Sequence, residues 1–165
     1  MKQIYLAGGC FWGTEAYFER LKGVTDTLCG YANGKTANPT YEEVCRANTG
    51  YAETVFIEYD PSVISLEKLL TEFFKTIDPT TKNRQGNDIG SQYRSGIYFV
   101  DAADAPVIQN LFADKQKKCI KPIVTEALPL SNFYPAEAYH QHYLDKNPGG
   151  YCHVDLGLIC PEDRK

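Results

Sequence analysis

The alternation of strand-like and helix-like segments constrains the fold of this chain more than any other feature. Alternating or β-branched runs predict strands at residues 2–7, 25–32, 51–60, 96–100 and 122–128. Apolar residues spaced three and four apart predict helices after residue 10, after Ser65, from Asp104 onward and over residues 136–144. We therefore expect an α+β fold, a two-layer ferredoxin-like sandwich with a long irregular C-terminal tail.

The length of 165 residues is typical of a single domain. We expect one catalytic domain over residues 1–165, in which residues 145–165 form a tail on the surface. Two polar segments rich in turn residues, 33–50 and 78–95, are long for simple connections. Because loops of this length in compact domains are usually functional, both are candidates for a site.

Charge and composition exclude several classes of partner. The net charge is −4, and Lys and Arg cluster only at residues 115–118, which argues against nucleic-acid binding. No run has the length of a membrane span, and the first residues do not form a secretory signal, so we expect a cytoplasmic protein that binds no membrane. Six cysteines in a reducing compartment indicate redox, metal or catalytic use rather than a disulfide framework.

Cys10 stands between two glycines and the aromatic pair Phe11 and Trp12, at the predicted start of a helix. A helix N-terminus offers free N–H groups and a partial positive charge, which lower the pKa of a cysteine. The glycines allow a sharp turn that exposes the sulfur. We therefore expect an ionised, accessible nucleophile beside an apolar wall. The alternative is that Cys10, Phe11 and Trp12 all belong to the core.

Cys152 and Cys160 lie in a segment rich in Gly and Pro, with no pattern that would bury them. Thiols on a mobile tail can reach an oxidised cysteine and reset it, which predicts that they are resolving thiols for Cys10. The alternatives are a structural disulfide or half of a zinc site, although the C-x7-C spacing matches no common zinc pattern. We therefore predict no metal.

The motifs GCFWGTEAYFE, NPTYEEVC, TGYAETV, RQGNDIGSQYRS and NPGGYC occur in this order between residues 8 and 160. In this combination the chain resembles the peptide methionine sulfoxide reductases of the A type. It departs from the family at two positions, where Tyr51 replaces the usual His of GHAE and Ile89 replaces that of GNDHG. Both departures leave the neighbouring acids, Glu53 and Asp88, in place.

The resemblance implies reduction of the S epimer of methionine sulfoxide, both free and in oxidised proteins. The implied substrate-binding residues are an apolar wall, oxygen donors and a further polar side chain: Phe11, Trp12, Tyr41, Glu53, Tyr93 and Asp88. Sulfoxide oxygen leaves only when protonated, so Glu53 must be neutral near pH 7, and burial against aromatics would raise its pKa. Without the resemblance, Glu53 would be a solvated strand residue, both tyrosines packing residues and Asp88 a turn residue.

The resemblance also implies a cycle of disulfides. Cys10 becomes a sulfenic acid, Cys152 condenses with it to a Cys10–Cys152 disulfide, and Cys160 then forms a Cys152–Cys160 disulfide. A thioredoxin-like protein reduces the last disulfide, so the enzyme needs an external thiol reductant and no bound cofactor. We expect a monomer that serves in protein repair under oxidative stress.

Two other functions remain open from the residues alone. A cysteine hydrolase would pair Cys10 with a histidine, for which the candidates are His140, His142 and His153. A redox-sensing module would oxidise at Cys10 without turning over a substrate.

Overall fold

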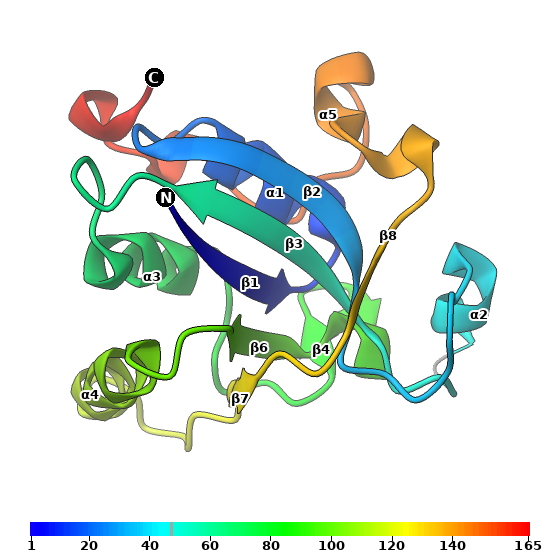
Figure 1. The fold of residues 1–165 in the computed structure, drawn as a ribbon, viewed down its shortest axis with the longest axis horizontal. Helices are drawn as coiled ribbons and strands as arrows, with labels where there is room; N and C mark the ends of the chain where they lie inside the picture. Colours follow the sequence, from blue (N-terminus) through cyan, green and yellow to red (C-terminus); the bar gives the residue numbers. More distant parts are fainter. Residues whose placement is uncertain (47) are drawn as a thin grey trace.

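A mixed sheet forms the centre of the computed structural model, which describes residues 1–46 and 48–165 (Figure 1). Its strands are β1 (Lys2–Gly8), β2 (Val24–Ala32), β3 (Ala52–Tyr59), β6 (Ser95–Phe99), β7 (Glu126–Pro129) and β8 (Phe133–Pro135). Their order across the sheet is β7-β6-β1-β3-β2-β8, with β6 and β7 parallel and all other neighbours antiparallel. A separate small hairpin pairs β4 (Arg84–Gln85) with β5 (Asp88–Ile89).

The helices are α1 (Phe11–Glu19), α2 (Tyr41–Cys45), α3 (Leu66–Lys75), α4 (Asp104–Gln116) and α5 (Tyr143–Lys146). Short 3-10 turns cover Ser91–Tyr93, Ala138–His140, Leu156–Leu158 and Pro161–Asp163. Among the described residues, no helix combines the length and the apolar character needed to cross a membrane. The predicted α+β class is confirmed, and β1, α1, β2, β3, α3 and β6 follow one another as β-α-β-β-α-β apart from α2 and the small hairpin.

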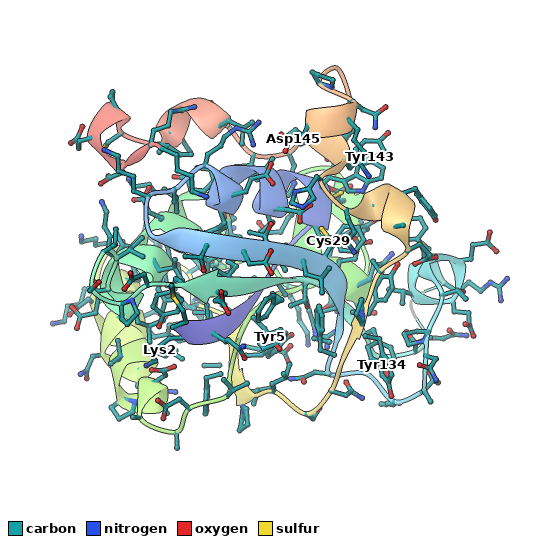
Figure 2. All side chains as sticks on the ribbon, turned by 45° about the horizontal axis from the view of Figure 1, so that its top comes forward. Lys2, Tyr5, Cys29, Tyr134, Tyr143 and Asp145 are labelled. Atoms are coloured by element: carbon teal, nitrogen blue, oxygen red, sulfur yellow. The ribbon has the colours of Figure 1, made fainter. Side chains whose placement is uncertain are left out.

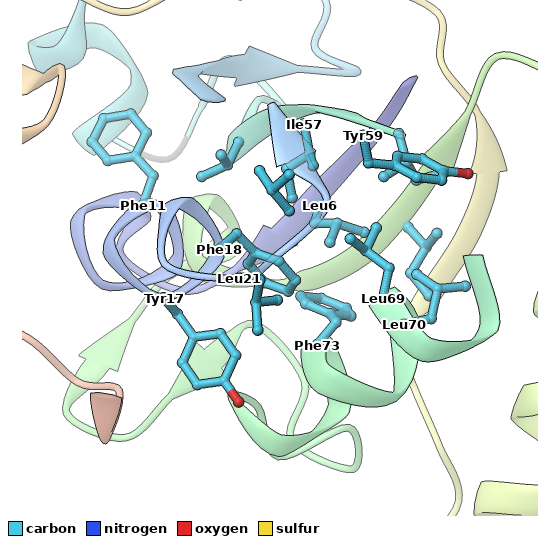
Figure 3. Close-up of a cluster of buried hydrophobic side chains, with 14 of the residues drawn as sticks. Leu6, Phe11, Tyr17, Phe18, Leu21, Ile57, Tyr59, Leu69, Leu70 and Phe73 are labelled. Atoms are coloured by element: carbon cyan, nitrogen blue, oxygen red, sulfur yellow. The ribbon is translucent and has the colours of Figure 1, made fainter. Parts of the chain in front are cut away.

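The main core lies between one face of the sheet and the helices α1 and α3. Figure 3 shows Leu6 and Ile57 of the sheet meeting Phe18 of α1 and Phe73 of α3, and all four side chains are fully buried. Successive strand residues face opposite sides, so the neighbours of these residues form a second cluster on the other face of the sheet. That cluster contains Ala7, Ala32, Ala52 and Tyr98, with Leu130 and Phe133 packed against it.

Two predicted elements differ from the structure, and one strand of the sheet was not predicted. The strand expected at 122–128 lies at Glu126–Pro129, because the N–H of Val124 bonds to the carbonyl of Pro79 and not to the sheet. The helix expected over 136–144 is broken, since His142 has a left-handed φ of 51° between the turn Ala138–His140 and α5. Strand β8 was not predicted, because three residues carry no periodic signal.

The segment that follows α5 contains two short 3-10 turns and is anchored to the rest of the protein. Val154 and Ile159 are buried, and the backbone N–H of Lys22 donates to the carbonyl of Asp163. The N–H of Lys165 donates to the carbonyl of Arg20 at the end of α1. The tail therefore packs along α1, and this packing helps to determine what surrounds Cys10.

Candidate active site

A tight turn joins β1 to α1 and carries Cys10. Gly9 has a φ of +87°, which few side chains tolerate. A Cβ on Gly9 would also lie 2.8 Å from Cβ of Gln85 and 2.9 Å from Nε2 of His153. Cys10 is the N-cap of α1, so its sulfur lies beside the free N–H groups of the first turn. The predicted strand, glycine turn and helix start are all present.

The Cys10 sulfur is less accessible and less acidic than predicted. Cys10 is only 8% exposed. Burial raises the pKa of its thiol well above the ordinary value, and the Glu53 carboxylate raises it further, while the N–H of Trp12 lowers it. The prediction of an exposed, ionised sulfur is therefore wrong for the free protein, because desolvation outweighs the helix N-terminus. Without substrate, Cys10 is a neutral thiol at pH 7.

Glu53 faces the same turn from β3. It is 1% exposed, and its Oε1 accepts the N–H of Phe11 at 3.2 Å. Its Oε2 is buried and has no hydrogen-bond partner in the described part of the chain. Burial raises the pKa of Glu53 to about 8, against the opposing effect of the Phe11 N–H. The carboxyl is therefore mostly neutral at pH 7, as the sequence argument expects.

The two long polar segments bring tyrosines to Glu53. Tyr41 is the first residue of α2, and Tyr93 ends the turn Ser91–Tyr93. Burial raises the pKa of both phenols, and the Glu53 carboxylate raises each of them further. Both phenols therefore keep their protons at pH 7 and can donate to an oxygen atom near Glu53.

The aromatic pair that follows Cys10 divides into a core residue and a surface residue. Phe11 is 1% exposed, and its ring centroid lies 5.8 Å from that of Tyr31 and 6.5 Å from that of Tyr41. Trp12 is partly exposed and stacks on Tyr143 of α5, with centroids 3.7 Å apart. Figure 2 shows Tyr143 above the sheet, on the side where the tail runs. Tyr143 thus covers one face of the Trp12 ring.

Tyr143 and His140 belong to this aromatic cluster, and the sequence argument missed their place in it. The Trp12 indole N–H donates to Nδ1 of His140 at 2.9 Å, and the His140 ring centroid lies 4.4 Å from that of Tyr41. The aromatic residues in AEAYHQHYL were the available signal. They were interpreted as one amphipathic helix instead of a bent segment over Trp12.

The three histidines have other partners than the sulfur of Cys10. His140 accepts the indole N–H of Trp12. The Nδ1 of His142 lies 2.7 Å from an oxygen of Glu19, on the C-terminal half of α1. His153 bonds through Nε2 to the carbonyl of Gly8 at 2.7 Å.

Of the two tail cysteines, Cys152 is the one placed at the site. A Cβ on Gly13, in the first turn of α1, would lie 3.1 Å from the Cys152 sulfur. After burial and Glu53, Cys152 is among the groups that raise the pKa of Cys10, so the two sulfurs share one site. The preceding residue, Tyr151, donates its hydroxyl to Oδ2 of Asp88 at 2.8 Å. Asp88 therefore holds the tail over α1.

Cys160 lies elsewhere. It precedes the turn Pro161–Asp163 and is close to Tyr17 and Lys68, on α1 and α3. All six cysteines are in the described part of the chain, and all are free thiols there. The structure thus brings together Cys10, Glu53 and Cys152, and it leaves Cys160 apart from them.

Residues 2–162 match the family model for peptide methionine sulfoxide reductase. The chain belongs to this family. Peptide methionine sulfoxide reductase MsrA of Clostridium acetobutylicum is 58% identical over 159 residues, which are 96% of this chain and 98% of the relative. MsrA of Clostridium botulinum strain Okra is 58% identical over 156 residues, 94% of this chain and 99% of the relative.

Solved structures of methionine sulfoxide reductases share the fold. The reduced form of Mxr1 from Saccharomyces cerevisiae has a TM-score of 0.84 and 42% identity, covering 99% of this chain and 92% of that chain. Methionine sulfoxide reductase A of Corynebacterium diphtheriae has a TM-score of 0.84 and 38% identity, covering 99% and 82%. Mxr1 in complex with Trx2 has a TM-score of 0.60 and 32% identity, covering 86% and 84%.

The two departures from the motifs of the methionine sulfoxide reductase family lie at the rim of the site. Tyr51 is buried over Gly34 and donates its hydroxyl to the carbonyl of Thr36, so it holds the segment before α2. Ile89 is 67% exposed at the end of β5. Neither side chain displaces Glu53 or Asp88.

One cluster on this reductase has the geometry of a possible metal site, and it is not the site of Cys10. Ligand atoms of Glu15, Glu19 and His142 lie within 4.8 Å of one another. Their mutual contacts account for this arrangement, because the N–H of His142 donates to Glu15 at 2.7 Å and its Nδ1 bonds to Glu19 at 2.7 Å. Thr27 donates to the other oxygen of Glu15 at 3.0 Å.

Proposed function

We propose that this reductase converts methionine S-sulfoxide, free and in oxidised proteins, to methionine, with external thiols as the source of electrons. The observation that carries the proposal is the neutral Glu53 carboxyl, which is hydrogen-bonded to the residue that follows Cys10. A nucleophilic sulfur and a proton donor thus face one point, as sulfoxide reduction requires.

The first step uses the proton of the Cys10 thiol and the proton of the Glu53 carboxyl. The Cys10 sulfur attacks the sulfoxide sulfur while Glu53 gives its proton to the sulfoxide oxygen. The thiol proton passes to Glu53 as the Cys10 sulfur attacks, and a transient S–S bond forms. The hydroxyl then moves from the sulfoxide sulfur to Cys10: the substrate S–O bond and the transient S–S bond break, a new S–O bond makes the Cys10 sulfenic acid, and methionine leaves. One thiol and one sulfoxide thus become one sulfenic acid and one sulfide, and Glu53 is protonated again.

The remaining residues would bind and orient the sulfoxide. Tyr41 and Tyr93 donate to its oxygen beside Glu53, which is supported by their protonated phenols. The Trp12 ring receives the methyl group, and Phe11 supports that wall from the core. Asp88 acts indirectly, since its hydrogen bond to Tyr151 holds the tail at the site.

Regeneration would begin at Cys152, which condenses with the sulfenic acid to a Cys10–Cys152 disulfide and water. Cys160 would then attack Cys152, which releases Cys10 and leaves a Cys152–Cys160 disulfide. Because Cys160 lies near Tyr17 in the reduced protein, this step requires the tail to rearrange. Thioredoxin would reduce the last disulfide, which the complex of Mxr1 with Trx2 supports.

The finer structural predictions also stand here as proposals. We classify the sheet and its two main helices as ferredoxin-like, which is supported by the order β6-β1-β3-β2 in the middle of the sheet. A single catalytic domain, a monomeric state, a cytoplasmic location and work without a bound cofactor remain predictions.

Incubation with free or peptide-bound methionine sulfoxide and dithiothreitol tests the function. The wild type should release methionine, Cys10→Ser should release none, and Cys152→Ser should stay active with dithiothreitol only. If the wild type releases no methionine, the reductase proposal fails and the redox-sensing module remains as the alternative. Loss of activity in His140→Ala, with Cys152 and Cys160 dispensable under every reductant, would favour the hydrolase.

Glu53→Gln tests the proton donor. The variant should slow sulfenic acid formation sharply at pH 7, and less at low pH, where solvent can supply the proton. An unchanged rate at pH 7 would rule out this role of Glu53.

A further inference from the structure

His153 follows Cys152 directly and is held in one orientation and one tautomer. Its Nε2 lies 2.7 Å from the carbonyl oxygen of Gly8 at the end of β1. A carbonyl oxygen only accepts hydrogen bonds, so Nε2 carries the proton of the neutral ring. The other ring nitrogen, Nδ1, therefore presents a free lone pair.

The lone pair of Nδ1 is buried beside the Cys152 sulfur. Within the described residues, Nδ1 has no hydrogen-bond partner. A Cβ on Gly13 would lie 3.1 Å from the Cys152 sulfur and 3.2 Å from Nδ1. Because both atoms lie so close to one point, their separation is at most about twice these distances. For the S–H to reach Nδ1, the Cys152 side chain must rotate away from its contact with the carbonyl of Val154.

In the reduced protein the Cys152 thiol donates to the carbonyl of Val154 at 3.1 Å. A carbonyl oxygen cannot take up the proton, so this contact does not activate the thiol. A neutral thiol is a poor nucleophile towards a sulfenic acid. The step that forms the disulfide therefore needs a base next to Cys152.

We propose that His153 is the general base of the resolving step, with Nδ1 as the proton acceptor. The proposal rests on the proposed function, because it concerns the second step of that cycle. Cys152 is then the nucleophile, His153 is the base, and the carbonyl of Gly8 orients the base. Cysteine nucleophiles are commonly activated by an adjacent base that a third group holds in place.

The step balances in atoms and protons. Nδ1 takes the proton of the Cys152 thiol, and the Cys152 sulfur attacks the sulfur of the Cys10 sulfenic acid. The S–O bond of Cys10 breaks, and the leaving hydroxide takes the proton from Nδ1. One disulfide and one water result, and His153 is neutral again. The carbonyl of Gly8 accepts the Nε2 hydrogen throughout and stabilises the transient positive charge.

The surroundings of the ring favour this role. Burial lowers the pKa of His153, while the bond to Gly8 and the charge of Asp88 act in the opposite direction. The ring is therefore neutral at pH 7 and free to accept a proton. The titratable groups around it are Cys152 and Tyr151 from its own segment, Cys10 from the adjoining turn and Asp88 from β5.

The variant His153→Gln distinguishes two roles of His153: accepting a proton at Nδ1, and holding the tail through the hydrogen bond from Nε2 to the carbonyl of Gly8. A glutamine amide can donate to the carbonyl of Gly8 as Nε2 does, but it has no basic lone pair. In a Cys160→Ser background, one turnover without reductant is followed by two readouts: released methionine, and the Cys10–Cys152 disulfide by peptide mass. We expect unchanged methionine release, which also reports an intact fold, and disulfide formation at least about a hundredfold slower at pH 7. The two rates should converge at alkaline pH, where hydroxide in the solvent can take the thiol proton.

A second measurement avoids the first chemical step. In Cys10→Ser protein, the rate of Cys152 alkylation by iodoacetamide is followed from pH 5.5 to 9.5 by peptide mass. At pH 7 the alkylation rate should be lower in His153→Gln, because imidazole no longer accepts the thiol proton. An equal alkylation rate at pH 7 in the two proteins would overturn the proposal. Disulfide formation slowed equally at every pH would also overturn it, because it would show that His153 only anchors the tail. Failure of the wild type to release methionine would refute the proposed function, while the alkylation profile would still test the base.

Discussion

Replacing Glu53 by Gln should stabilise the protein at alkaline pH while it removes the proton donor. The neutral carboxyl and the amide have the same shape, and each can accept the N–H of Phe11 through Oε1. The two side chains differ in that only Glu53 can become charged. A buried charge without a partner destabilises the folded state, so the wild type should lose stability as Glu53 ionises and the variant should not.

The size of the effect follows from the pKa of Glu53. Burial raises this pKa from 4.5 to about 8. The folded protein therefore binds its proton more tightly than the unfolded chain, and stability falls as the pH rises from about 4.5 through 8. At about 1.4 kcal/mol for each pH unit, the whole loss is about 5 kcal/mol. It is complete above pH 8 and absent below pH 4.5.

Denaturant unfolding at a series of pH values from 4.5 to 9.5 measures this effect, with the fluorescence of the single tryptophan, Trp12, as the probe. The quantity to compare is the difference in unfolding free energy between Glu53→Gln and wild type, because all other titrating groups cancel in it. We expect this difference to grow by several kcal/mol between pH 4.5 and 9. A difference that stays constant over this range would refute the argument that burial keeps Glu53 neutral.

The remaining predictions concern the wall and the tail. Trp12→Ala should weaken substrate binding by about 1.5–3 kcal/mol, seen as a higher KM for methionine release, if the methyl group packs on the ring. Gly13→Ala places a Cβ 3.1 Å from the Cys152 sulfur, so it should slow disulfide formation in a single turnover and spare the first methionine; equal rates would mean that the tail moves freely. Cys160→Ser should keep full activity with dithiothreitol and lose turnover with thioredoxin. Equal thioredoxin rates would leave Cys152 as the sole resolving thiol.

Local sequence signals predicted most of the fold. The alternation in YAETVFIEYD and the cap at Ser65 correspond to β3 and to the start of α3. The glycine turn before Cys10 is also where it was expected. These features depend on neighbours in the chain, which a single sequence contains. The break at His142 was missed, because a left-handed residue there depends on how the segment packs over Trp12.

The ionisation of Cys10 could not be predicted in the same way. A helix N-terminus is visible in the sequence, and its effect on a thiol has a known sign. The opposing effects are burial, which is the larger, and charges from groups far along the chain, among them Glu53 on β3 and Cys152 in the tail. The sequence argument assumed a mobile tail, and a mobile tail would have left the sulfur exposed. The sequence argument therefore missed both the burial of Cys10 and the charges near it, which together raise the pKa of its thiol.

A Cys10 thiol that is neutral before substrate binds is compatible with the proposed first step. It also means that the step needs no proton from solvent. If Cys10 began as a thiolate, Glu53 would end the first step as a buried anion and would have to recover a proton from solvent. With both groups neutral, the thiol proton replaces the one that Glu53 gives away, so no buried charge remains. The resolving step at Cys152 likewise needs no proton from solvent, because the proton that His153 takes from the thiol leaves with the hydroxide as water. Each step of the proposed cycle thus begins and ends with neutral groups, which a site this deeply buried requires.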